Sequence, residues 1–189
     1  MGRYFLGLEV PQEPCGRTLI KVEERLEPLL DVKKWYRSEQ FHITTHFLGD
    51  LDAGQVQRVI ELVTPHMAAQ QPFQLRIDHA GWFPRAKVVW CGVSGDVAPL
   101  QALYAVLAEP LNTLGAGRFA HDQFRPHITL GRLRSTDPHW QPPDVADLLQ
   151  GAEWDVTALH LYESVSAGPE GPQYPVRHTF PFAKKRVGS

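Results

Sequence analysis

The sequence predicts an α+β domain with largely antiparallel strands. Three segments with helical periodicity are interleaved with apolar, strand-like runs, but without the regular alternation of a doubly wound parallel sheet. The tripeptide His-Ile-Thr occurs twice, each time inside an apolar run. The chain has 189 residues and 43% hydrophobic content, which fits one domain or two closely packed lobes of about 90 residues each.

The helices are predicted from apolar positions that recur at helical spacing. These positions are Leu19, Val22, Leu26, Leu29 and Leu30 in the first segment, Val56, Val59, Ile60, Val63 and Met67 in the second, and Leu100, Leu103, Tyr104, Leu107, Leu111 and Leu114 in the third. Asp52 precedes the second segment, and its carboxylate with Gln55 three residues later predicts a cap. Gly115 and Gly117 end the third.

Seven runs have the composition of strands. They are Tyr4–Val10, Phe41–Leu48, Phe73–Phe83, Val88–Val93, Arg125–Leu133, Trp154–Ser164 and Tyr174–Phe182. Two stretches rich in Gly or Pro, residues 138–143 and 167–172, predict irregular connections between them.

Composition excludes several classes of function. A formal net charge of −2 lacks the basic excess of proteins that bind long nucleic-acid duplexes, so a nucleic-acid ligand is expected to be short and held at an end. Cys15 and Cys91 belong to no metal or disulfide pattern, which favours a reducing cytoplasm. No apolar stretch approaches the roughly 20 residues of a membrane span. We therefore expect a cytoplasmic protein without membrane contact.

The repeated His-x-Thr motif carries the chemistry. Side chains alternate along a strand, so His42 and Thr44 are expected on one face, with Ile43 in the core. His127 and Thr129 repeat this arrangement 85 residues later, and a duplicated two-lobe architecture follows as a hypothesis. If both strands border one cleft, two imidazoles and two hydroxyls converge there.

This set of groups suits metal-independent cleavage of a phosphodiester. One neutral imidazole takes a proton from attacking water, while one protonated imidazole gives a proton to the leaving oxygen. The threonine hydroxyls donate to the non-bridging oxygens. A 2′,3′-cyclic phosphate is a fitting substrate because ring strain assists its opening. The residues alone do not decide which histidine has which role.

The chain resembles the bacterial and archaeal RNA 2′,3′-cyclic phosphodiesterases, also called 2′-5′ RNA ligases, of the 2H phosphoesterase superfamily. The resemblance extends over nearly the whole chain and rests on residues 3–11, 41–50, 124–132 and 161–164. It implies a bilobal α+β fold in which two mainly antiparallel sheets with outer helices flank a central cleft. Residues 1–189 would form one domain of two pseudo-symmetric lobes.

The resemblance also implies roles. His42 would be the proton donor to the 3′ oxygen and His127 the proton acceptor from water, which leaves a 2′-phosphate. Thr44, Thr129 and Arg132 would meet the phosphate, and no metal or cofactor is required. The partner would be RNA with a 2′,3′-cyclic phosphate end, such as tRNA halves or short oligonucleotides, and the protein a monomer. Reverse 2′-5′ ligation is expected as the lesser activity.

Four further residues are candidate substrate contacts: Arg125, Phe124, Tyr162 and His46. His46 stands where the family often has a long basic side chain, and strand alternation puts it on the face of His42, at the cleft edge or on the surface. Phe5 and Leu6 point to opposite faces, so the aromatic expected to stack on a base is not assured.

Two basic clusters are also candidates for a rim that binds RNA. They are Arg125, Arg132 and Arg134 in one cluster and Lys33, Lys34 and Arg37 in the other. Short charge runs are usually solvated, so Arg132 is the preferred candidate for contact with RNA, followed by Arg125.

Three alternatives stay open. A binding module for RNA ends or nucleotides would need no paired acid and base. Small cyclic nucleotides or ADP-ribose cyclic phosphate would suit the same site. A metal site is disfavoured, because the four-residue spacing of His42 and His46 suits a helix and no HExxH motif occurs.

Overall fold

The computed structural model of the chain describes residues 1–119 and 124–185. Its helices are α1 (Arg17–Leu26), α2 (Ala53–Ala68) and α3 (Val97–Thr113). Its strands are β1 (Gly2–Glu9), β2 (Val32–Trp35), β3 (His42–Leu51), β4 (Phe73–Phe83), β5 (Val88–Gly95), β6 (His127–Leu133), β7 (Glu153–Val156), β8 (Ala158–Ser166), β9 (Pro172–Gln173) and β10 (Val176–Pro181).

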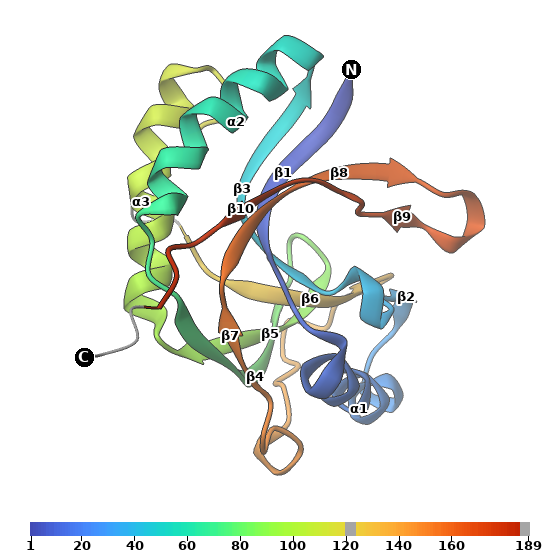
Figure 1. Ribbon diagram of the computed structural model, residues 1–189. Coiled ribbons are helices and arrows are strands. Elements are labelled where there is room, and N and C mark those ends of the chain that lie inside the picture. Colours follow the sequence, from blue (N-terminus) through green and yellow to red (C-terminus); the bar gives the residue numbers. More distant parts are fainter. Residues whose placement is uncertain (120–123, 186–189) are drawn as a thin grey trace.

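The strands form a strongly curved antiparallel sheet in the order β10-β8-β1-β3-β6-β5-β4-β7, with β2 paired to β6 and β9 to β8 (Figure 1). The halves β10-β8-β1-β3 and β6-β5-β4-β7 meet at β3 and β6, through the single residue pair Ile43–Ile128. The predicted α+β class with antiparallel strands is confirmed, and the two predicted sheets are joined through this one pair.

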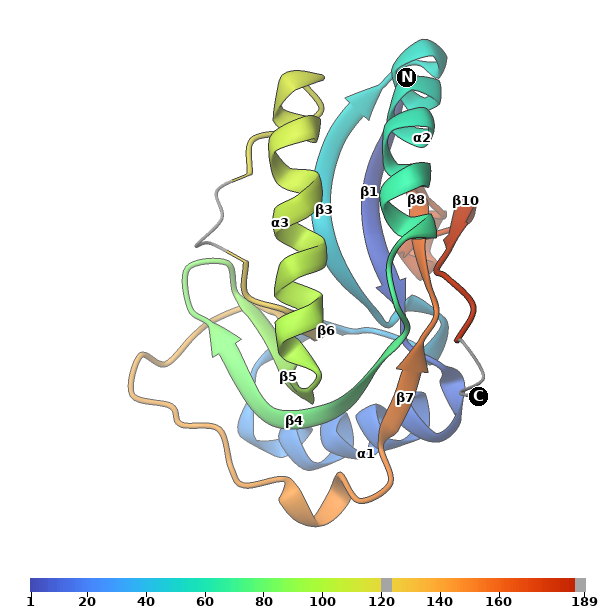
Figure 2. The same ribbon diagram turned by 60° about the vertical axis from the view of Figure 1, so that its left-hand side comes forward.

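The helices cover the sheet from outside. Figure 2 shows α2 and α3 side by side over β1 and β3, while α1 lies beneath β4 and β5. Each helix buries the central residues of its predicted apolar stripe, which are Leu19, Val22 and Leu26 in α1, Val59, Val63 and Met67 in α2, and Leu100, Leu103, Tyr104, Leu107 and Leu111 in α3. The predicted cap of α2 is confirmed, because the Gln55 amide donates to Asp52 Oδ1 at 2.8 Å and the Asp52 amide to Gln55 Oε1 at 2.9 Å.

The predicted end of the first helix is wrong. Helix α1 stops at Leu26, and residues 27–29 form a 3₁₀ turn in which Leu29 is 49% exposed. Pro28 has no N–H group, and its ring hinders a continued α-helix.

Two predictions about strands also fail. The run Trp154–Ser164 is two strands, because β7 pairs with β4 and β8 with β1, so the chain crosses between the two halves of the sheet at Thr157. Strand β2, which pairs with β6, is absent from the seven predicted strands. The last predicted strand, Tyr174–Phe182, is shorter and begins at Val176.

Within residues 1–119 and 124–185, no helix combines the length and the apolar character that crossing a membrane requires. Cys15 and Cys91 are both buried and form no disulfide. The division of the chain into two pseudo-symmetric lobes stays a prediction.

Candidate active site

The two His-x-Thr motifs lie side by side where the halves of the sheet meet. Because β3 and β6 run antiparallel through the pair Ile43–Ile128, His42 lies across from Thr129 and Thr44 across from His127. Both isoleucines are fully buried, and the four polar residues are only partly buried. The expected convergence of two imidazoles and two hydroxyls on one face is what this register produces.

Both imidazoles are held in the same way. His42 Nδ1 lies 2.7 Å from the Gln40 carbonyl oxygen, and His127 Nδ1 lies 2.7 Å from the Arg125 carbonyl oxygen. A carbonyl only accepts a hydrogen bond, so Nδ1 carries the proton in each ring. The other nitrogen, Nε2, is then the atom that exchanges a proton in each histidine. In His42 this atom lies 3.1 Å from Thr44 Oγ1.

Aromatic side chains pack against both rings. The His42 ring centroid lies 4.9 Å from that of Phe5 and 4.8 Å from that of Tyr174, while His127 lies 5.1 Å from Phe83. Burial lowers the pKa of His42 to about 4, although the Gln40 carbonyl opposes this shift and the nearby His127 adds to it. Burial also lowers the pKa of His127. Both imidazoles are therefore neutral at pH 7 in the free protein.

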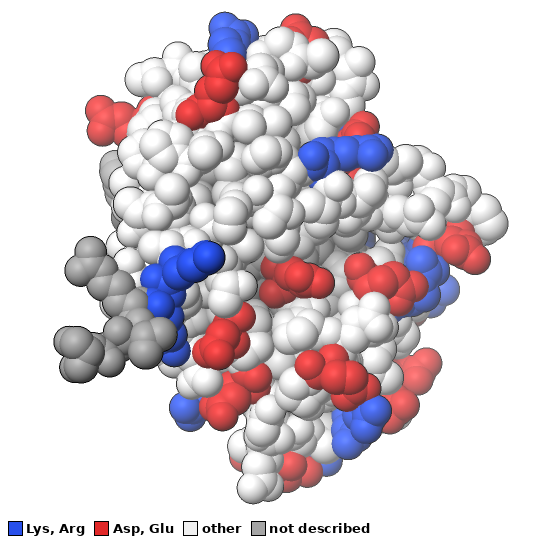
Figure 3. Space-filling model, in the orientation of Figure 1, with Lys and Arg blue, Asp and Glu red and all other residues white. Residues whose placement is uncertain are grey.

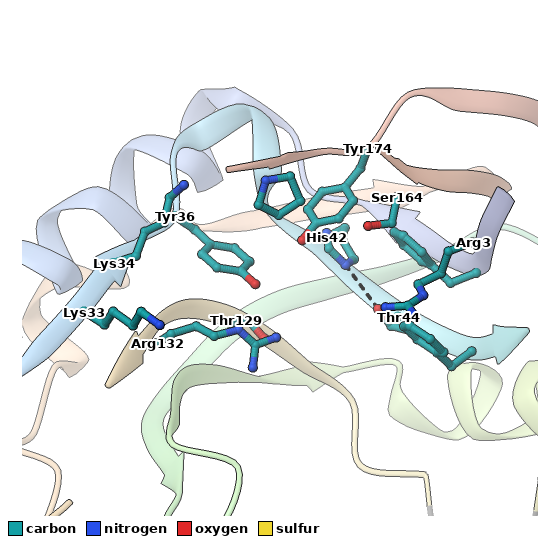
Figure 4. Close-up of a pocket in the computed structure, with 13 residues that line it drawn as sticks. Arg3, Lys33, Lys34, Tyr36, His42, Thr44, Thr129, Arg132, Ser164 and Tyr174 are labelled. Atoms are coloured by element: carbon teal, nitrogen blue, oxygen red, sulfur yellow. Dashed lines mark hydrogen bonds between the residues drawn. The ribbon is translucent and has the colours of Figure 1, made fainter. Parts of the chain in front are cut away.

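A cavity of about 380 Å³ opens beside His42 (Figure 4). Its wall includes the predicted site residues His42, Thr44, Thr129 and Arg132. His127 is not part of this wall but lies next to it, across the strand pair from Thr44. The other lining residues are Arg3, Phe5, Lys33, Lys34, Tyr36, Phe47, Ser164, Pro172 and Tyr174.

A β-bulge interrupts each motif strand three residues after its histidine. Leu6 and Gly7 of β1 face His46 and Thr44 of β3, so Thr45 is an extra residue. Leu130 is the extra residue of β6, between the partners of Val89 and Trp90. A bulge re-aims the side chains that follow it.

These bulges decide which later residues reach the cavity. Arg132 and Phe47 each stand five residues after a motif histidine, where simple alternation would turn them away from it. After the bulge they face the cavity instead. Phe47 was not predicted, and alternation gives no signal for it.

The prediction that His46 lies on the face of His42 is wrong. His46 is fully buried on the opposite side of the sheet, against α3, where its ring stacks on Tyr104 at 4.7 Å. Its Nε2 donates to the Tyr104 carbonyl oxygen at 3.0 Å, and its Nδ1 lies 2.9 Å from Thr45 Oγ1. Burial lowers the pKa of His46 to about 4. It is a neutral core residue.

A third bulge brings two consecutive lysines to the cavity. Val32 and Lys34 of β2 face Leu133 and Arg132 of β6, so Lys33 is an extra residue. Consecutive strand residues normally point to opposite faces, yet Lys33 and Lys34 both line the cavity. The sequence drew attention to this cluster, but not to its orientation. Of the other basic residues considered, Arg134 pairs with Asp31 and Arg37 with Glu39.

The remaining predicted contacts lie outside this cavity. Tyr162 is 6% exposed, stacks on Phe5 at 5.0 Å and borders a second cavity of about 180 Å³ that also touches His42. Phe124 stacks on Tyr104 at 4.6 Å. The Arg125 side chain is exposed, and the backbone carbonyl of Arg125 accepts the hydrogen bond from His127 Nδ1. Contact of these residues with a substrate stays a prediction.

The part of the chain that the structure describes contains no group of three or more His, Cys, Asp or Glu side chains arranged to hold a metal ion.

Comparisons with known proteins identify a family and several relatives. The model of the 2′-5′ RNA ligase superfamily matches residues 20–168. The RNA 2′,3′-cyclic phosphodiesterase of Escherichia coli is 30% identical over 164 residues, which are 86% of each chain. The protein of that name from Methanocaldococcus jannaschii is 26% identical over 180 residues, which are 92% of this chain and 97% of the relative.

A solved structure of E. coli LigT with 3′-AMP superposes with a TM-score of 0.79 at 25% identity and covers 97% of this chain and 99% of that one.

Proposed function

We propose that this chain, which belongs to the 2′-5′ RNA ligase superfamily, hydrolyses RNA 2′,3′-cyclic phosphate ends with His42 and His127 as its acid–base pair. The relatives that carry the name RNA 2′,3′-cyclic phosphodiesterase support the reaction. The assignment of His42 and His127 as the acid–base pair depends on one observation, the paired arrangement of their imidazoles. Each is locked through Nδ1 by the carbonyl two residues before it, on strands that meet at Ile43–Ile128.

In this reaction water attacks phosphorus and the bond to the 3′ oxygen breaks. Nε2 of neutral His127 takes the proton of the attacking water, and Nε2 of protonated His42 gives its proton to the 3′ oxygen. The product is a 2′-phosphate, and the two histidines have exchanged protonation states. Thr44, Thr129 and Arg132 donate hydrogen bonds to the non-bridging oxygens.

Protonation of His42 depends on the substrate. In the free protein burial holds the pKa of His42 at about 4, which disfavours a proton donor at neutral pH. A phosphate anion beside the ring favours the charged imidazole and raises this pKa. The bound substrate therefore charges its own general acid.

The proposal extends to the reverse reaction and to the RNA substrate. A catalyst accelerates both directions, so the same residues also support 2′-5′ ligation of RNA ends as a lesser activity. The RNA end of a short oligonucleotide or a tRNA half is the proposed substrate. Monomeric state and cytoplasmic location stay predictions.

The test is an assay of purified protein, in EDTA, on a short RNA that ends in a 2′,3′-cyclic phosphate, with separation of 2′- and 3′-phosphate products. We expect a 2′-phosphate from the wild type and loss of nearly all activity in His42→Ala and in His127→Ala, because the pair acts as a unit. The exposed His139→Ala variant is the matched control.

Binding of the RNA without any turnover would instead indicate a binding module. Turnover that disappears in EDTA would contradict the metal-independent mechanism.

A further inference from the structure

The candidate cavity is strongly basic although the chain as a whole is not. Its wall carries four cationic side chains, Arg3, Lys33, Lys34 and Arg132, and no carboxylate among its described residues. The formal net charge of the chain is −2, and on the face seen in Figure 3 acidic and basic side chains are interspersed. The cavity therefore has a local excess of positive charge, which attracts an anion of more than one charge.

Two of these cations have no counterion. Within residues 1–119 and 124–185, Lys33 and Arg132 make no hydrogen bond or ion pair through their side chains. Lys34 Nζ, in contrast, donates to the Glu170 carbonyl oxygen at 2.6 Å, and Arg3 Nε lies 3.8 Å from Asp50 Oδ1. Figure 4 shows Lys33 and Arg132 at one end of the cavity and Arg3 beside Thr44 at the other.

One cyclic phosphate does not use all of this charge. It carries a single negative charge, which the histidines, the threonines and Arg132 already meet in the proposed reaction. Lys34 lies across from Arg132. Arg132 is three residues after Thr129 on β6, which separates the two by roughly 7–10 Å along the strand. The lysines therefore lie away from the reacting phosphorus. The Arg132 side chain is long enough to reach back toward Thr129 and contact the cyclic phosphate. Lys33 then has no anionic partner in the proposed reaction.

We propose that Lys33, assisted by Lys34, forms a second phosphate subsite, which binds the phosphate on the 5′ oxygen of the nucleotide that carries the cyclic end. This inference rests on the proposed function. In an RNA chain this group is the internucleotide phosphodiester, and in a mononucleotide it is a 5′-phosphate. Both present non-bridging oxygens to the amine, and a cavity of about 380 Å³ falls within the size range of small-molecule sites.

The kinetic test compares three substrates that share one reacting group. They are uridine 2′,3′-cyclic phosphate, its 5′-phosphorylated form, and a dinucleotide with the same cyclic end. We expect kcat/KM to be about 10-fold higher for the second and third than for the first, since each adds a charge-assisted contact. In Lys33→Ala this advantage disappears, while activity on the first substrate stays near that of the wild type.

The control and a second variant separate charge from folding. Lys21→Ala on α1 removes an exposed lysine outside the cavity and is expected to keep the advantage. Lys33→Glu is expected to reverse it. The slope of log kcat/KM against log salt for the dinucleotide is expected to fall by about 0.7 in Lys33→Ala, as for one lost phosphate contact on a single strand.

The outcomes keep the two proposals apart. Equal kcat/KM of the wild type for all three substrates would overturn the subsite and leave the proposed function standing. An advantage for the dinucleotide but not for the 5′-phosphate would assign the subsite to the phosphodiester alone. No turnover of any substrate would overturn the proposed function. The subsite is then decided by calorimetry, where uridine 2′,5′-bisphosphate must bind more tightly than uridine 2′-phosphate in the wild type but not in Lys33→Ala.

Discussion

Replacing His46 with glutamine isolates one buried histidine from the pH dependence of stability. His46 is neutral in the folded protein because burial lowers its pKa by more than the Tyr104 carbonyl oxygen raises it. Its pKa is lowered from 6.5 to about 4. The unfolded chain therefore binds a proton at this site below pH 6.5, whereas the folded protein does not until about pH 4. The contribution of neutral His46 to stability is therefore present above pH 6.5 and is lost progressively as the pH falls toward 4.

The size of the effect follows from the two pKa values. Each pKa unit corresponds to about 1.36 kcal/mol, so the full shift of His46 amounts to about 3 kcal/mol. Between pH 7 and pH 5 the linkage gives a loss of about 2 kcal/mol. His42, with a pKa of about 4, adds a similar loss to the wild type. The prediction therefore concerns the difference between variant and wild type and not the total.

The assay is urea unfolding at pH 7, 6 and 5 for the wild type, His46→Gln and the exposed control His139→Gln. A glutamine side chain offers an N–H group for the Tyr104 carbonyl oxygen that His46 Nε2 contacts, and it does not titrate. We expect the variant to lose about 2 kcal/mol less than the wild type between pH 7 and pH 5. Equal losses in the two proteins would refute the assignment of His46 as a buried neutral residue.

Three further predictions follow from the site. First, kcat/KM reports ionisations of the free enzyme. Since the pKa values of His42 and His127 are lowered, its optimum is expected below pH 6.5, with a fall of about 10-fold per pH unit on the alkaline side. An optimum above pH 7 would contradict this. Second, Arg132→Lys keeps the charge but loses the forked donors, so kcat/KM on the cyclic phosphate is expected to fall about 10-fold. Full activity would show that charge alone suffices. Third, a Cβ at Gly131 would lie 2.8 Å from the Lys34 carbonyl oxygen and push β2 away from β6. Gly131→Ala is therefore expected to lower the free energy of unfolding in urea by about 1–3 kcal/mol, and an unchanged value would mean that β2 adjusts freely.

Much of the fold was predictable because it depends on local patterns. The stripes that begin at Leu19, Val56 and Leu100 become α1, α2 and α3, and the pair Asp52 and Gln55 forms the predicted cap. Each of these signals uses residues within a few positions of one another. The predictions failed where the chain leaves a local rule, as at Thr157, where an apolar run crosses from one half of the sheet to the other.

The site divides in the same way. Alternation along a strand was enough to place His42 with Thr44 and His127 with Thr129, because no bulge separates the members of either pair. That the two pairs face each other is a property of the Ile43–Ile128 contact. Arg132 follows from the family resemblance alone, since simple alternation turns this residue away from the cavity.

The sequence by itself therefore determined the α+β class, the three helices, and the two imidazoles and two hydroxyls that make phosphodiester chemistry the best hypothesis. Only the tertiary structure decided that His46 is a core residue and that Lys33, Phe47 and Arg132 face the cavity. The physical reason is that alternation is a property of one strand, whereas a bulge arises between two strands and depends on how each pairs with its neighbour. One extra residue in a strand turns every later side chain to the other face, and nothing in the residues of that strand alone fixes where this occurs.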